Sequence, residues 1–126
     1  MVGFVIVSHS RNLAQSVVEI TGMMAPGAPI AGAGGLEDGS FGTSFERISE
    51  AIDAVYSDDG VILLVDMGSA VMTAEMVIEN RADRKIRMAD CPLVEGAIAG
   101  TGDSISGFTM EEILEDLEEV RTAKKF

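Results

Sequence analysis

Several residue types are scarce in this sequence, and each shortage argues against a class of function. Cys91 is the only cysteine, so no disulfide can form within the chain, and a reducing compartment such as the cytoplasm suits it. The 9 basic residues face 21 acidic ones, for a formal net charge of −12, which opposes binding to nucleic acid or to an anionic membrane. Aromatic residues make up 5% of the chain, so stacking on bases or sugars is not expected.

Long apolar runs are also missing. No stretch approaches the roughly 20 apolar residues that a membrane-spanning helix needs, and the first residues lack the basic and apolar regions of a secretory signal. A cytoplasmic protein is therefore expected. The length of 126 residues, 47% of them hydrophobic, predicts one domain over residues 1–126 with a single core.

Short β-branched runs alternate with helical periodicity along the chain. Strands are predicted over 3–8, 29–33, 61–65 and 85–89, and helices over 12–24, 70–80, 93–100 and 110–123. One further helix is predicted to begin after Thr43 or Ser44, with a buried face that carries Phe45, Ile48, Ile52 and Val55. This alternation is typical of an α/β fold with an open, doubly wound, mainly parallel sheet and helices on both faces. We predict the strand order 2-1-3-4.

The helices carry recognisable starts and apolar faces. The predicted N-caps are Ser10, Thr43 or Ser44, Ser69 and Thr109, with Glu46 completing a capping box from Thr43. The first helix is expected to bury Leu13, Val17, Ile20 and Met24. Five methionines are interpreted as core residues: Met67, Met72, Met76, Met88 and Met110.

One candidate site follows from this topology. His9, the only histidine, comes directly after the first strand, and Asp66 comes directly after the third. In the predicted order these strands are neighbours whose connections leave in opposite directions, so a crevice opens between their carboxyl ends. An aspartate that accepts a hydrogen bond from one ring nitrogen leaves the other as a nucleophile or base. The sequence does not tell which nitrogen reacts.

The groups predicted to bind an anion surround this pair. The helix that begins near Ser69 has free N–H groups and a dipole that attract anions, and Gly68 permits a close approach to that backbone. Ser10, Gly34 and Gly35 are expected to line the same pocket. Because no P-loop or dinucleotide-binding glycine motif is present, the predicted ligand is a single phosphoryl group on His9. Neither a cofactor nor a metal is expected, since no second histidine or nearby cysteine accompanies His9.

Each of these residues also has a plainer interpretation. His9 could be a surface or core histidine, Asp66 could only cap a turn, and Gly34 and Gly35 could only shape a turn. Cys91 is interpreted as a small buried residue. A serine hydrolase is weakly supported, since no serine lies in a G-x-S-x-G elbow.

A family resemblance adds to this interpretation. The opening VIVSHS resembles the mannose-family IIA proteins of the bacterial sugar phosphotransferase system. Further segments are similar to the branch that serves dihydroxyacetone kinase: residues 31–35, 38–39, 42–44, 65–70, 75–76 and 92–97. Residues 68–71 read Gly-Ser-Ala-Val where transporter relatives usually have Gly-Gly-Ser-Pro, which favours the kinase branch. Two positions depart from the branch pattern: Leu36 replaces a threonine, and Met67 replaces an aliphatic residue.

The resemblance implies a phosphotransferase subunit and its partners. His9 would accept a phosphoryl group from the carrier HPr, oriented by Asp66, and pass it to ADP held by the kinase subunit DhaL. The subunit DhaK would hold dihydroxyacetone. The resemblance also implies a homodimer and a single-domain form that depends on free HPr. Two alternatives stay open: a IIA domain that phosphorylates a IIB sugar-transport subunit, and an acidic, non-catalytic module that binds a regulator.

Overall fold

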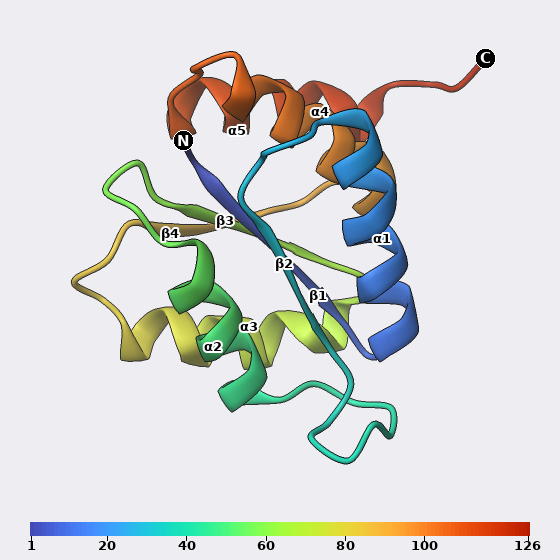
Figure 1. The fold of residues 1–126 in the computed structure, drawn as a ribbon, viewed down its shortest axis with the longest axis vertical. Helices are drawn as coiled ribbons and strands as arrows, with labels where there is room; N and C mark the ends of the chain where they lie inside the picture. Colours follow the sequence, from blue (N-terminus) through green and yellow to red (C-terminus); the bar gives the residue numbers. More distant parts are fainter.

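A four-stranded parallel sheet in the order β2-β1-β3-β4 forms the centre of the computed structural model, which describes residues 1–126 (Figure 1). The predicted α/β class and strand order are confirmed. The strands are β1 (Gly3–Ser8), β2 (Ile30–Gly34), β3 (Val61–Val65) and β4 (Ile86–Ala89). The helices are α1 (Arg11–Met24), α2 (Phe45–Val55), α3 (Gly68–Asn80), α4 (Leu93–Ile105) and α5 (Met110–Thr122).

Helices cover both faces of the sheet. In Figure 1, α1, α4 and α5 lie on one side of the strands, and α2 and α3 lie on the other. Alternate residues of β1 divide between the two apolar layers, because successive side chains of a strand point to opposite faces. Phe4 and Ile6 pack with α1, α4 and α5, whereas Val5 and Val7 pack with α2 and α3. Every residue of β1 is buried, which makes it the rigid support of whatever follows Ser8.

The buried face of α1 differs from the predicted one. Val17 is buried, but Leu13, Ile20 and Met24 are 41%, 44% and 60% exposed. The helix instead packs through small side chains, its buried residues being Ala14, Val17 and Thr21. Gly34 of β2 explains this choice, because a Cβ built there would lie 2.4 Å from a backbone oxygen of the α1 N-terminus. The same Cβ would lie 2.8 Å from the Cβ of Ala14, so the position of Ala14 has no room for a leucine side chain.

Several other local predictions were wrong. Met67, Met72 and Met76 are exposed rather than in the core, while Met110 is buried and Met88 is half-buried. Met72 and Met76 belong to α3, which buries only Ala70, Ala74 and Val77.

The predicted helix ends also need correction. Ser44, not Thr43, caps α2, and its hydroxyl accepts from the N–H of Arg47, so the capping box proposed from Thr43 does not form. Helix α4 continues five residues beyond its predicted end, to Ile105. The cap of α5 at Thr109 is confirmed, with a reciprocal box to Glu112.

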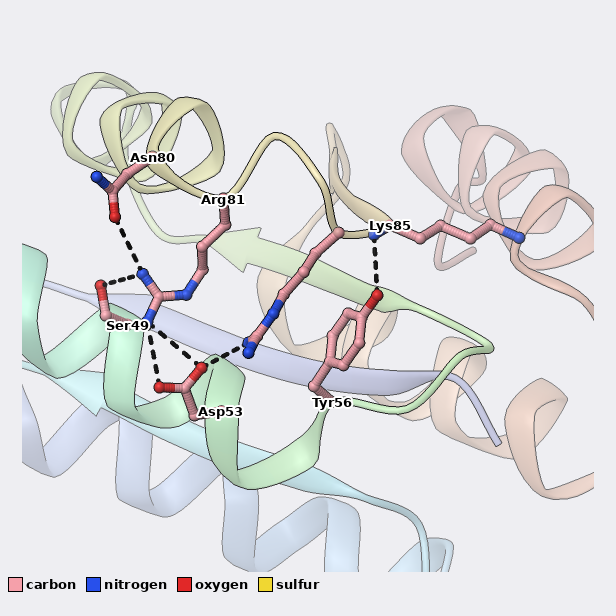
Figure 2. A network of polar contacts seen from close by, with 7 residues as sticks. Ser49, Asp53, Tyr56, Asn80, Arg81 and Lys85 are labelled. Atoms are coloured by element: carbon pink, nitrogen blue, oxygen red, sulfur yellow. Dashed lines mark hydrogen bonds and ion pairs between the residues drawn. The ribbon is translucent and has the colours of Figure 1, made fainter.

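A polar network fixes the connection that leads into β4 (Figure 2). Arg81 and Arg84 both donate to the Asp53 carboxylate at the end of α2. The Arg84 guanidinium also lies 4.8 Å from the centre of the Tyr56 ring, whose hydroxyl accepts from the N–H of Lys85. These contacts lie at the amino ends of the strands, opposite His9, and they set where β4 begins.

Candidate functional site

His9 and Asp66 meet where β1 and β3 end, as their strand positions predict. The two strands pair in parallel up to Val7 and Val65, and the N–H of Asp66 donates to the Val7 carbonyl at 3.1 Å. The next side chains are thereby brought together: His9 Nδ1 lies 3.0 Å from Asp66 Oδ1. The His9 side chain is 22% exposed and that of Asp66 is 10% exposed.

Asp66 does more than face the ring, because its second oxygen holds the backbone that carries the ring. Oδ2 accepts from the His9 backbone N–H at 2.9 Å and from the buried Ser8 hydroxyl at 2.9 Å. The Ser8 oxygen in turn accepts from the N–H of Ser10 at 3.0 Å. One carboxylate thus fixes both the position of residue 9 and the rotation of its imidazole.

These contacts decide the protonation state of the carboxylate. Burial by itself raises the pKa of Asp66, but the hydrogen bonds from the His9 backbone, the His9 ring and Ser8 outweigh it and hold the pKa below its usual range. A carboxylate only accepts hydrogen bonds, so the Nδ1 that faces it carries the proton. In the neutral ring, Nε2 then has the free electron pair.

The free pair of Nε2 points to the start of α3. Ser69 Oγ lies 2.8 Å from Nε2, and with the proton on Nδ1 of the neutral ring the Ser69 hydroxyl is the donor in that contact. Ser69 was predicted to cap this helix, but the N-cap is Met67, which provides no side-chain hydrogen bond. The amides of Gly68 and Ser69 therefore make no hydrogen bond within the protein. Nothing lies within 4 Å of a Cβ built on Gly68, so the space in front of these amides is open.

The segment that follows β2 closes the other side of His9. The N–H of Gly42 donates to the His9 carbonyl at 3.0 Å. The guanidinium of Arg11, at the start of α1, donates to the Leu36 and Glu37 carbonyls at 3.2 and 3.3 Å. Residue 9 is thus held through its N–H by Asp66, directly after β3, and through its carbonyl by the segment after β2. The sequence did not predict the hydrogen bond from the Gly42 N–H to the His9 carbonyl, because no sequence motif indicates it.

Three of the predicted phosphoryl ligands have other partners in this structure. The Ser10 hydroxyl caps α1 by accepting from the N–H of Leu13 at 3.2 Å. Gly34 provides the close approach to α1 described above, and Gly35 has a φ of 70° and donates its N–H to the Ser8 carbonyl. Ser10 therefore serves as a helix cap, and Gly34 and Gly35 shape the backbone. Contact with a phosphoryl group stays a prediction for all three residues.

His9 does not line any of five hollows of the surface. The one with the greatest volume of these five, about 570 Å³, lies between α4 and the C-terminal residues. No helix has the length and apolar character to cross a membrane.

Comparison with known proteins agrees with this geometry. The family described as PTS system fructose IIA component, EIIA-man, matches residues 3–120. The phosphoryl donor subunit DhaM of the PEP-dependent dihydroxyacetone kinase of Escherichia coli K12 is 36% identical over 99% of this chain, and the chain spans only 28% of that protein. The phosphotransferase subunit DhaM of the PTS-dependent dihydroxyacetone kinase of Lactococcus lactis is 35% identical over 97% of this chain and 98% of its own length.

A solved structure supports the fold alone. A protein of unknown function, EF1359, superposes with a TM-score of 0.84 at 23% identity, over 100% of this chain and 99% of the other.

The family match over residues 3–120 assigns this open parallel sheet to the phosphotransferase-system IIA class of domains. The match covers almost all of the chain from β1 to α5, which is enough to assign the family. The chain belongs to the EIIA-man family.

Proposed function

We propose that this chain is a phosphohistidine carrier that receives a phosphoryl group on His9 Nε2 from HPr and passes it to ADP bound in a DhaL subunit. The observation that carries this proposal is the fixed ring: Asp66 holds Nδ1 at 3.0 Å, and Nε2 faces Ser69 and the open amides of α3. The two relatives named above are dihydroxyacetone kinase subunits, which supports this acceptor. DhaK is then the subunit that holds dihydroxyacetone.

The proposed step needs no group beyond the two proteins. The Nε2 electron pair attacks phosphorus, the N–P bond of phosphorylated HPr breaks, and the leaving nitrogen keeps the electron pair. The Nδ1 proton stays between His9 and Asp66, which stabilises the charge that develops on the ring. In the second transfer a terminal phosphate oxygen of ADP attacks phosphorus, and His9 leaves with its original electron pair.

The groups around Nε2 suit a phosphoryl group. Ser69 can turn its hydroxyl from Nε2 to a phosphoryl oxygen, and the N–H groups of Gly68 and Ser69 lie at the positive end of α3. We assign these two residues as the first phosphoryl ligands. Ser10, Gly34 and Gly35 are proposed to act by shaping the surrounding backbone, and their contact with phosphate remains to be tested. The proposal includes a cytoplasmic homodimer and no resident cofactor.

Reconstitution of the relay tests this function. With phosphoenolpyruvate, enzyme I and HPr, the protein should gain one acid-labile phosphoryl group, detected as a mass increase that disappears in acid. His9→Ala should abolish the label, and Cys91→Ser, which changes the only thiol, should retain it. A label that persists on His9→Ala would contradict the proposal.

The acceptor is tested separately, because the family description names a fructose IIA component. The phosphorylated protein is offered either DhaL loaded with ADP or a IIB sugar-transport subunit. Rapid loss of the label to DhaL, with ATP as the product, is expected. Transfer to IIB alone would assign a transport role, and no transfer to either, together with partner binding that persists in His9→Ala, would favour a regulatory module.

A further inference from the structure

The segment after β2 holds the backbone on both sides of the reactive histidine. The N–H of Gly35 donates to the Ser8 carbonyl at 3.1 Å, and the N–H of Gly42 donates to the His9 carbonyl at 3.0 Å. We call residues 35–42 the clamp segment. Residues 36–41, between its two anchors, are all exposed, so burial of apolar surface contributes little to their conformation. The clamp segment therefore depends on polar contacts to stay closed.

Most of these polar contacts lie within the clamp segment and do not attach it to the rest of the protein. The Leu36 N–H donates to the Ser40 carbonyl at 2.9 Å. The Asp38 carboxylate accepts from the N–H and the hydroxyl of Ser40 at 3.0 and 2.6 Å. Arg11 is the one side chain from outside that donates to the segment, and its Nη2 reaches the Leu36 and Glu37 carbonyls at 3.2 and 3.3 Å.

Helix stability does not explain an arginine at position 11. Arg11 is the first residue of α1, where the positive end of the helix dipole disfavours a cation. The first turn of α1 contains no acidic residue, and the ion pairs of the chain do not include Arg11. Its hydrogen bonds to the clamp segment are the contacts that account for its presence.

We propose that Arg11 is a positioning residue that acts on His9 through the clamp segment. Arg11 holds the Leu36 carbonyl, and the Leu36 side chain packs over Gly42, with its Cγ 3.0 Å from the point where a Cβ of residue 42 would lie. Gly42 in turn holds the His9 carbonyl. Only the predicted change of rate rests on the proposed function, since these contacts exist before any phosphoryl group arrives.

Fixing the His9 carbonyl matters because a rotation of the backbone at residue 9 would also move the ring. Asp66 holds the N–H and Nδ1 of this residue, and the clamp segment holds its carbonyl. With the carbonyl released, Nε2 would be aligned with the incoming phosphorus for less of the time, and small misplacements of a reacting atom slow the reaction. The limiting rate of phosphorylation should then fall, while binding of the phosphoryl donor should change little.

The kinetic test is Arg11→Met, which removes the donors but retains a good helix former. Lys124→Met is the matched control, because Lys124 is exposed, makes no contact with the clamp segment and loses the same charge. In single-turnover reactions with phosphorylated HPr, we expect Arg11→Met to lower the limiting rate roughly three- to tenfold and to leave the half-saturating concentration within about twofold. Lys124→Met should change neither quantity.

Two further readings separate positioning from a merely structural role. The urea midpoint of Arg11→Met should be unchanged or higher, because a cation leaves the positive end of α1. Arg11→Lys should recover most of the rate, since an ammonium group can donate to the same carbonyls. A rate that falls together with the urea midpoint, or a change confined to the half-saturating concentration, would overturn the proposal.

Amide exchange measured by NMR tests the same contacts without any phosphoryl donor. The Gly42 amide should exchange roughly three- to tenfold faster in Arg11→Met, whereas the Gly35 amide, which extends the β1–β2 pairing, should keep its rate. Leu36→Ala should act like Arg11→Met, and the double variant should be no worse than the more affected single variant, because both residues lie on one path. Unchanged Gly42 exchange, or additive effects, would overturn the inference. If the unmodified chain gains no label while Gly42 exchange responds as expected, the proposed function fails and the positioning of residue 9 stands.

Discussion

Replacing Asp66 by asparagine changes hydrogen-bond chemistry with almost no change of shape, and the structure determines the outcome. The carboxylate accepts three hydrogen bonds: Oδ2 receives those of Ser8 and the His9 backbone, and Oδ1 receives that of Nδ1. An asparagine has one acceptor oxygen. That oxygen satisfies two donors if it takes the Oδ2 position, which turns the amide NH₂ towards Nδ1. The ring must then move its proton from Nδ1 to Nε2.

The size of the expected rate loss follows from a comparison of the two orientations that the amide at position 66 can adopt. The flipped amide would satisfy one donor and oppose two, and each buried donor left without an acceptor costs about 1–3 kcal/mol. The wrong tautomer is therefore favoured by roughly 1–3 kcal/mol. Loss of the charge-assisted bond to the phosphorylated ring adds about 1.5 kcal/mol. We expect Asp66→Asn to slow phosphorylation of His9 by roughly 10²- to 10³-fold, at about 1.4 kcal/mol for each factor of ten.

Two assays check this reasoning. Rapid-quench kinetics with phosphorylated HPr measure the rate, and ¹⁵N spectra of the ring report which nitrogen carries the proton without assignment, since His9 is the only histidine. Ser8→Ala is the matched control: it removes one contact to the same carboxylate but leaves Oδ1 facing Nδ1, so the tautomer should not change. An Asp66→Asn protein that keeps its Nδ1 proton, or reacts within fivefold of the wild-type rate, would refute the argument.

Three further outcomes are expected. Ser69→Ala should lower the equilibrium level of phosphohistidine about five- to tenfold, as measured by mass spectrometry against phosphorylated HPr, because one neutral donor contributes about 1 kcal/mol. Gly34→Ala should lower the free energy of unfolding by about 1–3 kcal/mol because its Cβ collides with the α1 backbone, whereas Gly102→Ala, with nothing within 4 Å, should raise it by about 0.5–1 kcal/mol; urea unfolding compares them. Burial and the neighbouring Asp116 raise the pKa of Asp103 to about 7, so the folded chain binds this proton more tightly than the unfolded chain and stability falls as pH rises from about 4 to 7. Asp103→Asn should flatten that dependence and raise the free energy of unfolding at pH 8 by on the order of 1 kcal/mol after allowance for solvent screening, as urea unfolding measures; an unchanged profile would contradict it.

The sequence was sufficient for the sheet because its strands are short apolar runs that only a buried parallel strand explains. The same reasoning brought His9 and Asp66 together, since both follow strands whose order is set by connection rules. The same reasoning failed on the buried face of α1, because Val17 belongs to two sets of helical positions. The predicted set also contains Leu13, Ile20 and Met24, and the buried set also contains Ala14 and Thr21. The choice between them depends on how closely α1 approaches β2, which Gly34 decides from elsewhere in the chain. Likewise, no local pattern reveals that the Gly42 N–H supports the His9 carbonyl.

The start of α3 shows how stability and function compete at this site. A serine or aspartate at position 67 would cap the helix and stabilise it by about 1 kcal/mol, but Met67 leaves the first amides unpaired. A capping side chain would occupy those N–H groups, and a carboxylate there would repel an incoming phosphoryl group. Ser69, one residue inside the helix, instead directs its hydroxyl to Nε2. The missing cap is therefore consistent with amides kept free for a charge that His9 carries only between its two transfers.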